Sequence, residues 1–475
     1  MSGDPSRIGS SFRDPSGFLF RRDGVLLRQV QERYRPHYEQ LMSSGLYAAL
    51  TAEGLLVPHV ERPLAEAAAP GAAYVLQPEL LPFISLPYEW CFAQRQAAAL
   101  LTLRVQEVAL AHGMTLKDAS AFNVQFRGVE PVLIDTLSFE RYVDGTPWVA
   151  YRQFCQHFLA PLLLQSRIDV RLGALLRQYL DGIPLDLASA LLPRRSWASP
   201  AALMHIHLHA KSIAKHAATE GARSGDRAGA RAGARAGSET TARVSTAGLE
   251  GLLSSLKGAI SGLSWQAGTE WGSYEETHNY DAAGRASKQG LVADFVRSAG
   301  ATRVIDLGAN AGEYSRVARD AGATLVVAAD GDPMAVERGF RRLREARESG
   351  VHPLLVDLTN PAPAQGWDHA EWPSLAARGP FDAVLALALV HHLAIGNNVP
   401  LVGVARMLAH LGTHVIIEWV PKPDPQVQRL LSAREDIFDG YTEEGLIAAF
   451  AEVGLQPRQR VAVGSSGRTL FRFAV

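Results

Sequence analysis

Small residues follow the first buried strand expected in the second half of the chain. In the segment VIDLGANAGEYSRVA the strand is expected to end at Asp306, and the chain then turns into a helix through Gly308, Asn310 and Gly312. A sharp turn from strand to helix favours glycine, and small residues let a ligand approach the backbone closely. Amide hydrogens at the start of the helix point toward such a ligand. This loop is therefore where a cofactor would lie.

Acidic residues end the next two expected strands. Asp330 closes ATLVVAAD, where a carboxylate is suited to accept hydrogen bonds from the two ribose hydroxyls of an adenosine ligand. Asp357 closes VHPLLVD and is placed to meet an adenine amino group. Ligands of open α/β sheets bind at the carboxyl ends of the strands, so the loop and both carboxylates are expected at one edge.

The strands that must position these residues alternate with helical patterns. Near-continuous apolar runs, typical of strands buried on both faces, occur at 302–307, 323–330, 351–357, 381–389 and 413–420. The last segments, LQPRQRVAV and RTLFRFAV, flank the turn GSSG and predict an antiparallel hairpin. The expected fold class is therefore α/β, a Rossmann-like parallel sheet that the terminal hairpin extends to seven strands.

With these features, the segment from about Trp265 to Val475 resembles the class I S-adenosylmethionine-dependent methyltransferase family. The phrases NPAPAQGW, LALALVHHLAI and EWVPKPDPQVQRLL are similar to bacterial methyltransferases of the nodulation-protein type. The resemblance implies S-adenosylmethionine as the cofactor, with the ribose at Asp330 and the adenine edge near Asp332. It implies further cofactor contacts at Asp306, Gly308, Asn310, Gly312, Asp357 and Leu358. Asn310 departs from the commonest pattern, which has glycine there. Asparagine tolerates left-handed backbone geometry, but its side chain leaves the ligand less room to approach the backbone.

The segment EWGSYEETHNYDAAGRASKQ precedes the helix before the first of these strands. It carries Tyr274, Tyr280 and Lys288, where related enzymes often place a lid over the sulfonium and the carboxylate of the cofactor. The alternative is a solvated loop with aromatic packing.

Candidate bases lie at the ends of the fourth and fifth expected strands. Methyl transfer is an in-line displacement on a sulfonium, and a base is needed only if the acceptor keeps its proton. His391 and His392 follow the fourth strand, and Glu418 lies near the end of the fifth, on the rim where an acceptor would sit. Alternatively, the histidine pair caps the next helix or packs against the cofactor, and Glu418 pairs with Lys422 or a nearby arginine.

The first half of the chain carries a second constellation. Asp118, Asn123 and Asp135 reproduce the D-x-x-x-x-N and later D spacing of a kinase-like catalytic loop. An Asp-Gly hairpin at 18–30 and a long helix at 90–113 precede them. This half therefore resembles an α+β protein-kinase-like or small-molecule phosphotransferase fold.

Departures from that pattern keep several interpretations open. Leu116 stands at the usual histidine position, Thr136-Leu137 replaces Phe-Gly, and a glycine-rich nucleotide loop is not evident. The hairpin has arginines such as Arg28 in place of the expected lysine, and arginine is not equivalent to lysine in geometry. A degenerate or acceptor-binding module, an active phosphotransferase and a coincidence of spacing are the three interpretations.

Two other polar patterns are given structural interpretations. His205, His207 and His209 alternate in MHIHLHAK, which aligns them on a strand but not on a helix, and without a matching carboxylate or thiol we expect no metal site. Residues 216–248 contain Ala-Gly-Ala-Arg repeats and almost no large apolar residue, which indicates a flexible linker. A helical stripe of spaced arginines that grips phosphate is the alternative for this segment.

The linker divides the chain into an acceptor-recruiting or kinase-like domain, 15–210, and a methyltransferase domain, 250–475. A net charge of -1 gives no reason to expect obligatory nucleic acid. Two cysteines in apolar contexts exclude a disulfide framework, and no run of 18 apolar residues occurs, so a soluble cytoplasmic protein is expected.

The leading hypothesis is methyl transfer to a small-molecule or a carbohydrate- or lipid-linked acceptor, with an oxygen or nitrogen nucleophile. Alternatives are a bifunctional kinase and methyltransferase, a nicotinamide-dependent oxidoreductase, and a non-catalytic two-domain scaffold. The oxidoreductase fits less well because the loop lacks the G-x-G-x-x-G spacing.

Overall fold

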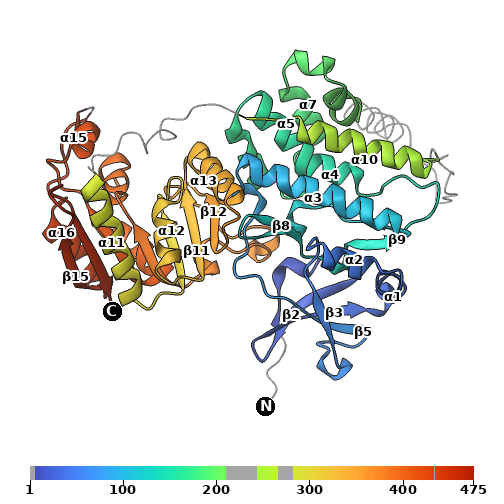
Figure 1. Ribbon diagram of the computed structural model, residues 1–475, viewed down its shortest axis with the longest axis horizontal. Helices are drawn as coiled ribbons and strands as arrows, with labels where there is room; N and C mark the ends of the chain where they lie inside the picture. The colour runs from blue at the N-terminus through green and yellow to red at the C-terminus, as the bar shows by residue number, and fades with distance from the viewer. Residues whose placement is uncertain (1–5, 210–242, 266–281, 433) are drawn as a thin grey trace, which may run out of the picture.

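A seven-stranded sheet forms the centre of the C-terminal half, residues 282–475. The computed structural model describes residues 6–209, 243–265, 282–432 and 434–475 (Figure 1). The strand order is β12-β11-β10-β13-β14-β16-β15, parallel except that β16 runs antiparallel to both neighbours. The strands are β10 (Arg303–Leu307), β11 (Leu325–Asp330), β12 (Val351–Leu355), β13 (Phe381–Ala386), β14 (Gly412–Trp419), β15 (Gln456–Ala462) and β16 (Thr469–Ala474). The seven strands and the terminal hairpin expected from the sequence are confirmed.

Helices cover both faces of this sheet because successive strand residues point to opposite sides. Val304 packs in one apolar cluster with Phe295 and Phe340, whereas its neighbour Ile305 packs in another with Leu408 and Phe450. The first face carries α11 (Ala282–Ser298), α12 (Glu313–Asp320) and α13 (Pro333–Glu345). The second carries α14 (Leu401–Leu411) and α16 (Glu443–Glu452), and α15 (Pro425–Leu431) follows β14. The near-continuous apolar strands of the sequence are thus buried on both faces.

The N-terminal half, residues 6–265, contains an antiparallel sheet of five strands in the order β1-β2-β3-β5-β4. They are β1 (Ser6–Arg7), β2 (Gly17–Arg22), β3 (Val25–Gln31), β4 (His59–Arg62) and β5 (Ala72–Pro78). The turn between β2 and β3 has positive φ at both Asp23 and Gly24, the geometry that asparagine, aspartate and glycine favour in two-residue hairpins. The expected hairpin is confirmed.

Beyond this sheet the N-terminal half is mainly helical. After α1 (Arg35–Ser43) and α2 (Leu46–Ala52), the long helix expected at 90–113 is α3 (Phe92–Ala111). Two small antiparallel pairs follow, β6 (Met114–Leu116) with β9 (Phe139–Arg141) and β7 (Val124–Arg127) with β8 (Glu130–Leu133). The remaining helices are α4 (Tyr151–Phe154), α5 (Ala160–Arg167), α6 (Leu175–Gln178), α7 (Leu185–Leu191), α8 (Pro200–Ala202) and α10 (Thr246–Ser261).

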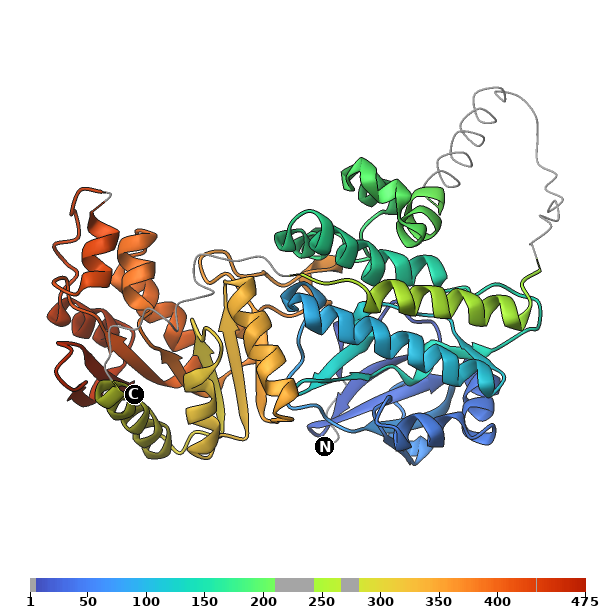
Figure 2. The ribbon, with the colours of Figure 1, turned by 45° about the horizontal axis from the view of Figure 1, so that its top comes forward.

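Helix α10 lies beside α3 (Figures 1 and 2). Gln96 of α3 donates to the carbonyl oxygens of Ile260 and Leu263, and Lys257 pairs with Glu107. The expected domain boundary at 250 therefore falls inside a helix that packs on the N-terminal half. The division into domains stays a prediction, and most of the proposed linker lies outside the described residues.

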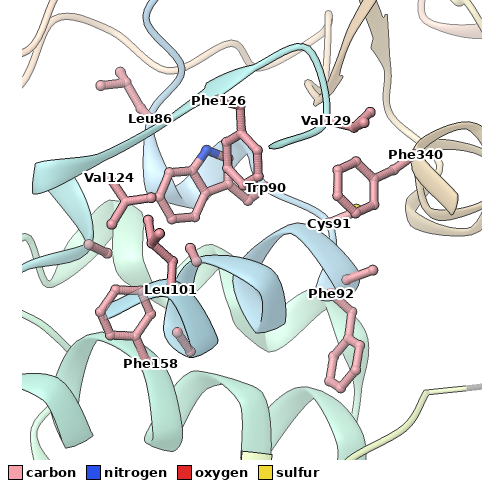
Figure 3. Packing of buried hydrophobic residues seen from close by; sticks show 14 of the residues in the cluster. Leu86, Trp90, Cys91, Phe92, Leu101, Val124, Phe126, Val129, Phe158 and Phe340 are labelled. Atoms are coloured by element: carbon pink, nitrogen blue, oxygen red, sulfur yellow. The ribbon is translucent and has the colours of Figure 1, made fainter. Parts of the chain in front are cut away.

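The two halves meet along the edge strand β12. Gln94 donates to the carbonyl oxygen of Pro353 at 3.0 Å, which occupies part of a sheet edge that would otherwise be open. Phe340 of α13 reaches Phe126 with ring centroids 6.1 Å apart, and Phe126 in turn contacts Trp90 at 5.3 Å (Figure 3). These three rings belong to one apolar cluster, so the core of the N-terminal half continues into one face of the C-terminal sheet. None of the helices in the described ranges is long and apolar enough to cross a membrane.

Candidate cofactor and active site

The loop after β10 and the tip of β11 are held together by backbone hydrogen bonds. The amides of Gly308 and Ala309 both donate to the carbonyl oxygen of Ala329, at 2.9 and 3.1 Å. The amide of Asn310 donates to Oδ2 of Asp330 at 2.8 Å. The structure therefore brings together Gly308 and Asp330, as expected for neighbouring parallel strands.

The turn needs residues that accept left-handed backbone conformations. Gly308, Asn310 and Gly312 have φ of 71°, 49° and 78°. Asparagine is among the few residues other than glycine that adopt such values readily. Gly312 immediately precedes α12, so the backbone amides at the start of that helix face the tip of the sheet.

Asp330 is half-buried at this edge. Its second oxygen accepts from the amide of Asp332 at 2.8 Å. Burial raises the pKa of Asp330 above its ordinary value, and the two amide hydrogen bonds oppose that shift. Asp332 itself caps α13 by accepting from the amide of Met334 at 2.8 Å, so Asp332 also fixes where that helix begins.

Asp306 lies beneath the loop. It is buried and accepts a hydrogen bond from the hydroxyl of Ser315 at 2.7 Å, which ties β10 to α12. Burial raises its pKa to about 6. Asp306 therefore fixes α12 relative to β10 on the two sides of the loop. Strand β10 continues one residue beyond Asp306, to Leu307.

Asp357 lies beside the tip of β11. The expected strand 351–357 ends earlier, at Leu355, although the amide of Val356 still donates to the carbonyl oxygen of Asp330. Asp357 is exposed and accepts from the amide and hydroxyl of Thr359 at 2.9 and 2.6 Å. A Cβ built on Gly331 would come within 3.9 Å of the Cα of Asp357, and Leu358 is half-buried next to it. Asp357 thus reaches the same edge from a loop, not from a strand.

Glu418 is the centre of a buried ion-pair network at the end of β14. It pairs with Lys288 of α11, and Arg468 donates to its Oε1 at 3.0 Å. Arg468 also pairs with Asp424 at 2.7 Å. Two cations therefore contact the buried carboxylate of Glu418. Its expected role as a general base stays a prediction. The sequence offered a nearby arginine or Lys422 as a partner of Glu418. The arginine is confirmed as Arg468, and Lys422 is wrong because it pairs with Asp436.

Lys288 points into this network. Its ammonium lies 4.4 Å from the ring centre of Tyr314 and its side chain is 5 % exposed. It is therefore part of the buried network and not of a solvated loop. Tyr274 and Tyr280, which the sequence also suggested for a lid, lie outside the described residues.

His391 and His392 follow β13 in an irregular stretch of backbone. Ala388 has a φ of 49°, unusual for alanine, and a π-helix spans His392–Gly396. Strained residues and π-helical turns are both frequent at functional sites. The expected strand 381–389 therefore ends at Ala386, before this stretch begins.

His391 is completely buried, and neither ring nitrogen has a hydrogen-bond partner among the described residues. Burial, then the neighbouring His392 and Arg468, lowers its pKa to about 3. The two imidazole centres are 4.1 Å apart, and the pKa of His392 is lowered too, chiefly by burial. Both histidines are therefore expected to be neutral near pH 7. Their pKa values lie below the near-neutral range that would suit a general base.

Sequence reasoning missed Ser315, Arg468 and Asp424. Ser315 lies nine residues after Asp306, in the first turn of α12, and a polar residue at a buried helix position is a signal for it. Arg468 follows the GSSG turn, and only the antiparallel register of β14 with β16 places it next to Glu418. That register cannot be read from local sequence.

Asp118, Asn123 and Asp135 lie close together in the N-terminal half. Asp118 is hydrogen-bonded to Asn123, and burial followed by the charge of Asp135 raises its pKa. The spacing in the sequence therefore identified residues that meet in space.

Asp135, however, is already surrounded by protein groups. Arg28 of β3 contacts its Oδ1 at 2.5 Å, and the amide of Leu137 donates to the same oxygen at 3.0 Å. The hydroxyl of Ser138 donates to Oδ2 at 2.5 Å. Within the described ranges no group of three or more histidine, cysteine, aspartate or glutamate side chains is arranged to hold a metal ion. The kinase-like interpretation of this half is not supported, and Asp135 is paired with the guanidinium of Arg28.

Of the alternating histidines, His205 and His207 lie in a π-helical turn, Leu203–His207, and His209 lies in the helical residues after it, so none lies in a strand. His205 contacts the hydroxyls of Tyr151 and Ser255, whereas His207 contacts Ser189 and Ser196. Their ring nitrogens thus point at different hydroxyl groups, as expected for side chains that splay around a helix.

No family model matches the chain. Nodulation protein NoeA of Rhizobium meliloti (strain 1021) is 37% identical over 473 residues, which cover 99% of this chain and 96% of NoeA. The chain belongs to the family of nodulation protein NoeA. Because the match spans almost the whole length, both halves of this NoeA family member are common to the two proteins.

Solved structures match the NoeA family member over less than half of its length. Magnesium protoporphyrin IX methyltransferase (ChlM) of Synechocystis PCC 6803, with bound SAH, is 16% identical and covers 42% of this chain and 88% of its own, with a TM-score of 0.30. N-methyltransferase NodS of Bradyrhizobium japonicum WM9 is 16% identical. The match covers 41% of this chain and 97% of NodS, with a TM-score of 0.30. The bifunctional kinase-methyltransferase WbdD is 18% identical. The match covers 45% of this chain and 44% of WbdD, with a TM-score of 0.30.

Proposed function

We propose that the C-terminal half transfers a methyl group from S-adenosylmethionine to a small-molecule or a carbohydrate- or lipid-linked acceptor. The observation that carries the proposal is the contact between the Asn310 amide and the Asp330 carboxylate. It joins a small-residue loop to a half-buried acid at the carboxyl ends of neighbouring parallel strands, the arrangement that suits an adenosine-containing ligand.

The hydrogen-bond acceptors at this edge fit that ligand. A carboxylate offers about four acceptor positions, and the carboxylate of Asp330 accepts from the backbone amides of Asn310 and Asp332. The remaining positions match the two hydroxyls of a ribose. Asp357 lies exposed beside them, where it would accept from an adenine amino group, and Leu358 would border the base.

The methionine part would then lie along the loop of Gly308, Asn310 and Gly312. Bound there, S-adenosylmethionine supplies an electrophilic methyl group on a sulfonium, and the protein contributes mainly position. The buried network of Lys288, Glu418 and Arg468 ties α11, β14 and the start of β16 together at the same end of the sheet.

His391 is the residue we assign to the acceptor side. As a neutral imidazole without a partner in the described structure, it can donate one hydrogen bond and accept another from an oxygen or nitrogen nucleophile. Its depressed pKa makes it an orienting group and not an efficient proton acceptor near pH 7. His392, beside it, is the second candidate.

For the N-terminal half we propose a role in recruiting or shaping the acceptor site. Phosphotransfer is disfavoured by the Arg28–Asp135 contact, which neutralises the acid that would hold a metal ion. NoeA is named for nodulation, a process that identifies no acceptor.

Titration calorimetry of the full chain against S-adenosylmethionine, NADH and magnesium-ATP tests these assignments. We expect a 1:1 binding isotherm with S-adenosylmethionine and none with the other two. Binding of NADH instead would favour an oxidoreductase, and binding of magnesium-ATP would restore the bifunctional alternative. No binding of any of the three would favour the scaffold.

The acceptor is best sought by chemistry. Incubating the protein with isotopically labelled S-adenosylmethionine and a small-molecule extract, followed by mass spectrometry, should show label in a hydroxyl- or amine-bearing compound. A heat-inactivated sample is the control.

A further inference from the structure

The segment between β12 and β13, residues 356–380, runs from the candidate cofactor edge to the N-terminal half. We call it the β12–β13 loop. Its first residues lie against β11, because the amide of Val356 donates to the carbonyl oxygen of Asp330 at 2.8 Å. Asp357 and Leu358 follow directly. Any force that positions this loop therefore acts on the residues assigned to the adenine end.

The loop has little regular structure of its own. It contains two three-residue 3-10 turns, at Trp367–His369 and Ala376–Arg378, and an isolated bridge between Gln365 and Trp372. Loops of this length without a helix or strand are uncommon in compact domains and are usually functional. Its conformation must be set largely by what it touches.

The near end of the loop is held by Arg177 of α6. The guanidinium donates to the carbonyl oxygens of Asn360 at 3.1 Å and Pro361 at 3.3 Å, three and four residues after Asp357. This is a contact from the N-terminal half to backbone next to the adenine-end residues.

The far end is held at several points by the same half. Trp372 stacks on Phe122, with ring centres 4.3 Å apart and planes at 26°. Glu371, next to Trp372, pairs with Arg13 at 2.7 Å. Gly9 lies so close to the loop that a Cβ built on it would come within 1.9 Å of the carbonyl oxygen of Ala370.

The exit of the loop is held by a buried ion pair. Arg378 pairs with Glu89, and both side chains are 5 % exposed. Arg378 also donates to the carbonyl oxygen of Ile84 at 2.9 Å. Contacts at the near end, the far end and the exit thus all come from the N-terminal half.

We propose that the N-terminal half is a structural part of the cofactor site, in which Arg177 and Trp372 are positioning residues that fix Asp357 and Leu358 against the adenine end of S-adenosylmethionine. This inference rests on the proposed function of the C-terminal half. It assigns to the N-terminal half a role in donor binding besides any role with the acceptor.

Arg177→Ala in the full chain is the first test. Binding of S-adenosylmethionine and of adenosine, measured by calorimetry, should weaken by the same factor, at least fivefold, because the displaced residues contact only the part that the two ligands share. Arg171→Ala is the matched control, since Arg171 is exposed and pairs with Asp169 within the N-terminal half. It should leave both affinities unchanged.

Trp372→Ala is the second test, with Trp367→Ala as its control. Both tryptophans lie in the β12–β13 loop, but Trp367 is 71% exposed. Trp372→Ala should weaken adenosine binding and Trp372→Phe should restore most of it, because phenylalanine keeps the stack on Phe122. Thermal melting of each variant separates a displaced loop from a damaged fold.

The outcomes separate the two proposals. Suppose that the wild-type protein binds S-adenosylmethionine, and that Arg177→Ala and Trp372→Ala bind S-adenosylmethionine and adenosine as tightly as the wild type and Trp372→Phe do. In that case this inference is wrong and the proposed function stands. If Trp372→Ala does not fold, unchanged adenosine binding by Arg177→Ala alone overturns the inference. If the wild-type protein does not bind S-adenosylmethionine, the proposed function fails and the inference fails with it.

Discussion

The backbone amide of Asn310 donates to the carboxylate of Asp330 across 2.8 Å, so the loop that ends one strand is fastened to the tip of the next. An asparagine with positive φ stands where glycine is commonest, and its own side chain accepts from the amide of Ala311 at 2.7 Å. The contact makes the position of the acid depend on the loop and the position of the loop depend on the acid.

Asp330→Asn should remove most of the affinity for S-adenosylmethionine. The amide keeps the size of the side chain but loses the charge and half of the acceptor positions. The loss of charge-assisted hydrogen bonds to the ribose corresponds to about 3 kcal/mol, or roughly 100-fold in Kd. Calorimetry measures it, with Asp320→Asn, an exposed acid on α12, as the control. An unchanged Kd in Asp330→Asn would show that the ribose lies elsewhere.

Asp306→Asn should stabilise the protein above pH 6. The folded pKa of Asp306, about 6, lies above its unfolded value of 3.8, so between these values the folded state binds more protons. Stability contributed by this group is therefore highest below pH 4 and falls as pH rises toward 6. At pH 7.5 the substitution should gain on the order of 3 kcal/mol, less any loss of the hydrogen bond from Ser315.

Urea denaturation at pH 4.5 and pH 7.5 checks this prediction. The difference between Asp306→Asn and the wild type should be larger at the higher pH. Asp294→Asn, an exposed acid on α11, serves as the control. An equal difference in unfolding free energy at both pH values would mean that burial does not raise the pKa of Asp306.

His391 should not titrate between pH 5 and pH 8. Its pKa is lowered to about 3 by burial, so the imidazole stays neutral throughout this range. The NMR signal of its Cε1–H group, identified by its loss in His391→Asn, should keep a constant chemical shift. A midpoint near pH 6.5 for His391 would place it in a hydrated environment.

Asp135→Asn should destabilise the N-terminal half. Arg28 is 10% exposed, and its remaining contact with Asp14 is longer, at 3.5 Å. Breaking a buried ion pair by removing one partner costs about 3–5 kcal/mol. Glu53→Gln, which breaks the exposed pair with Arg104, should cost below about 1 kcal/mol. Guanidinium denaturation compares the two, and equal small losses would contradict a structural role for Arg28.

Phe340→Ala should weaken both halves at once. Phe340 is completely buried on α13 and contacts Phe126 of the N-terminal half, so truncation leaves a cavity in the shared core (Figure 3). Loss of a buried phenylalanine costs about 3–5 kcal/mol. Leu80→Ala, at a position 62% exposed, should change stability little. Two separate transitions in the wild-type protein, of which only one shifts, would show that the halves unfold independently.

Local sequence was sufficient for the elements and for the first outline of the site. Apolar runs of strand length predicted the parallel sheet, because a strand buried on both faces needs apolar residues at every position. Asp23-Gly24 predicted a hairpin, and Gly308, Asn310 and Gly312 predicted a turn that needs positive φ. These signals are short-range, since each depends on the backbone conformation that a few neighbouring residues prefer.

Tertiary structure decided which charges meet. Glu418 lies between Lys288 and Arg468 because the antiparallel register of β14 and β16 brings distant residues side by side. Arg28 reaches Asp135 across more than one hundred residues of chain. Local sequence contains no information about which partner packing brings to each of these carboxylates.

The relation between the halves was likewise decided in three dimensions. The repetitive segment near residue 216 suggested separable domains, yet Phe340 completes the core around Trp90 and Arg177 holds the loop beside Asp357. The sequence by itself determined the strands, the turn residues and the acids at the strand ends. Packing of distant segments alone determined their protonation, their partners and the wall of the site, because those depend on burial and on contacts between residues far apart in the chain.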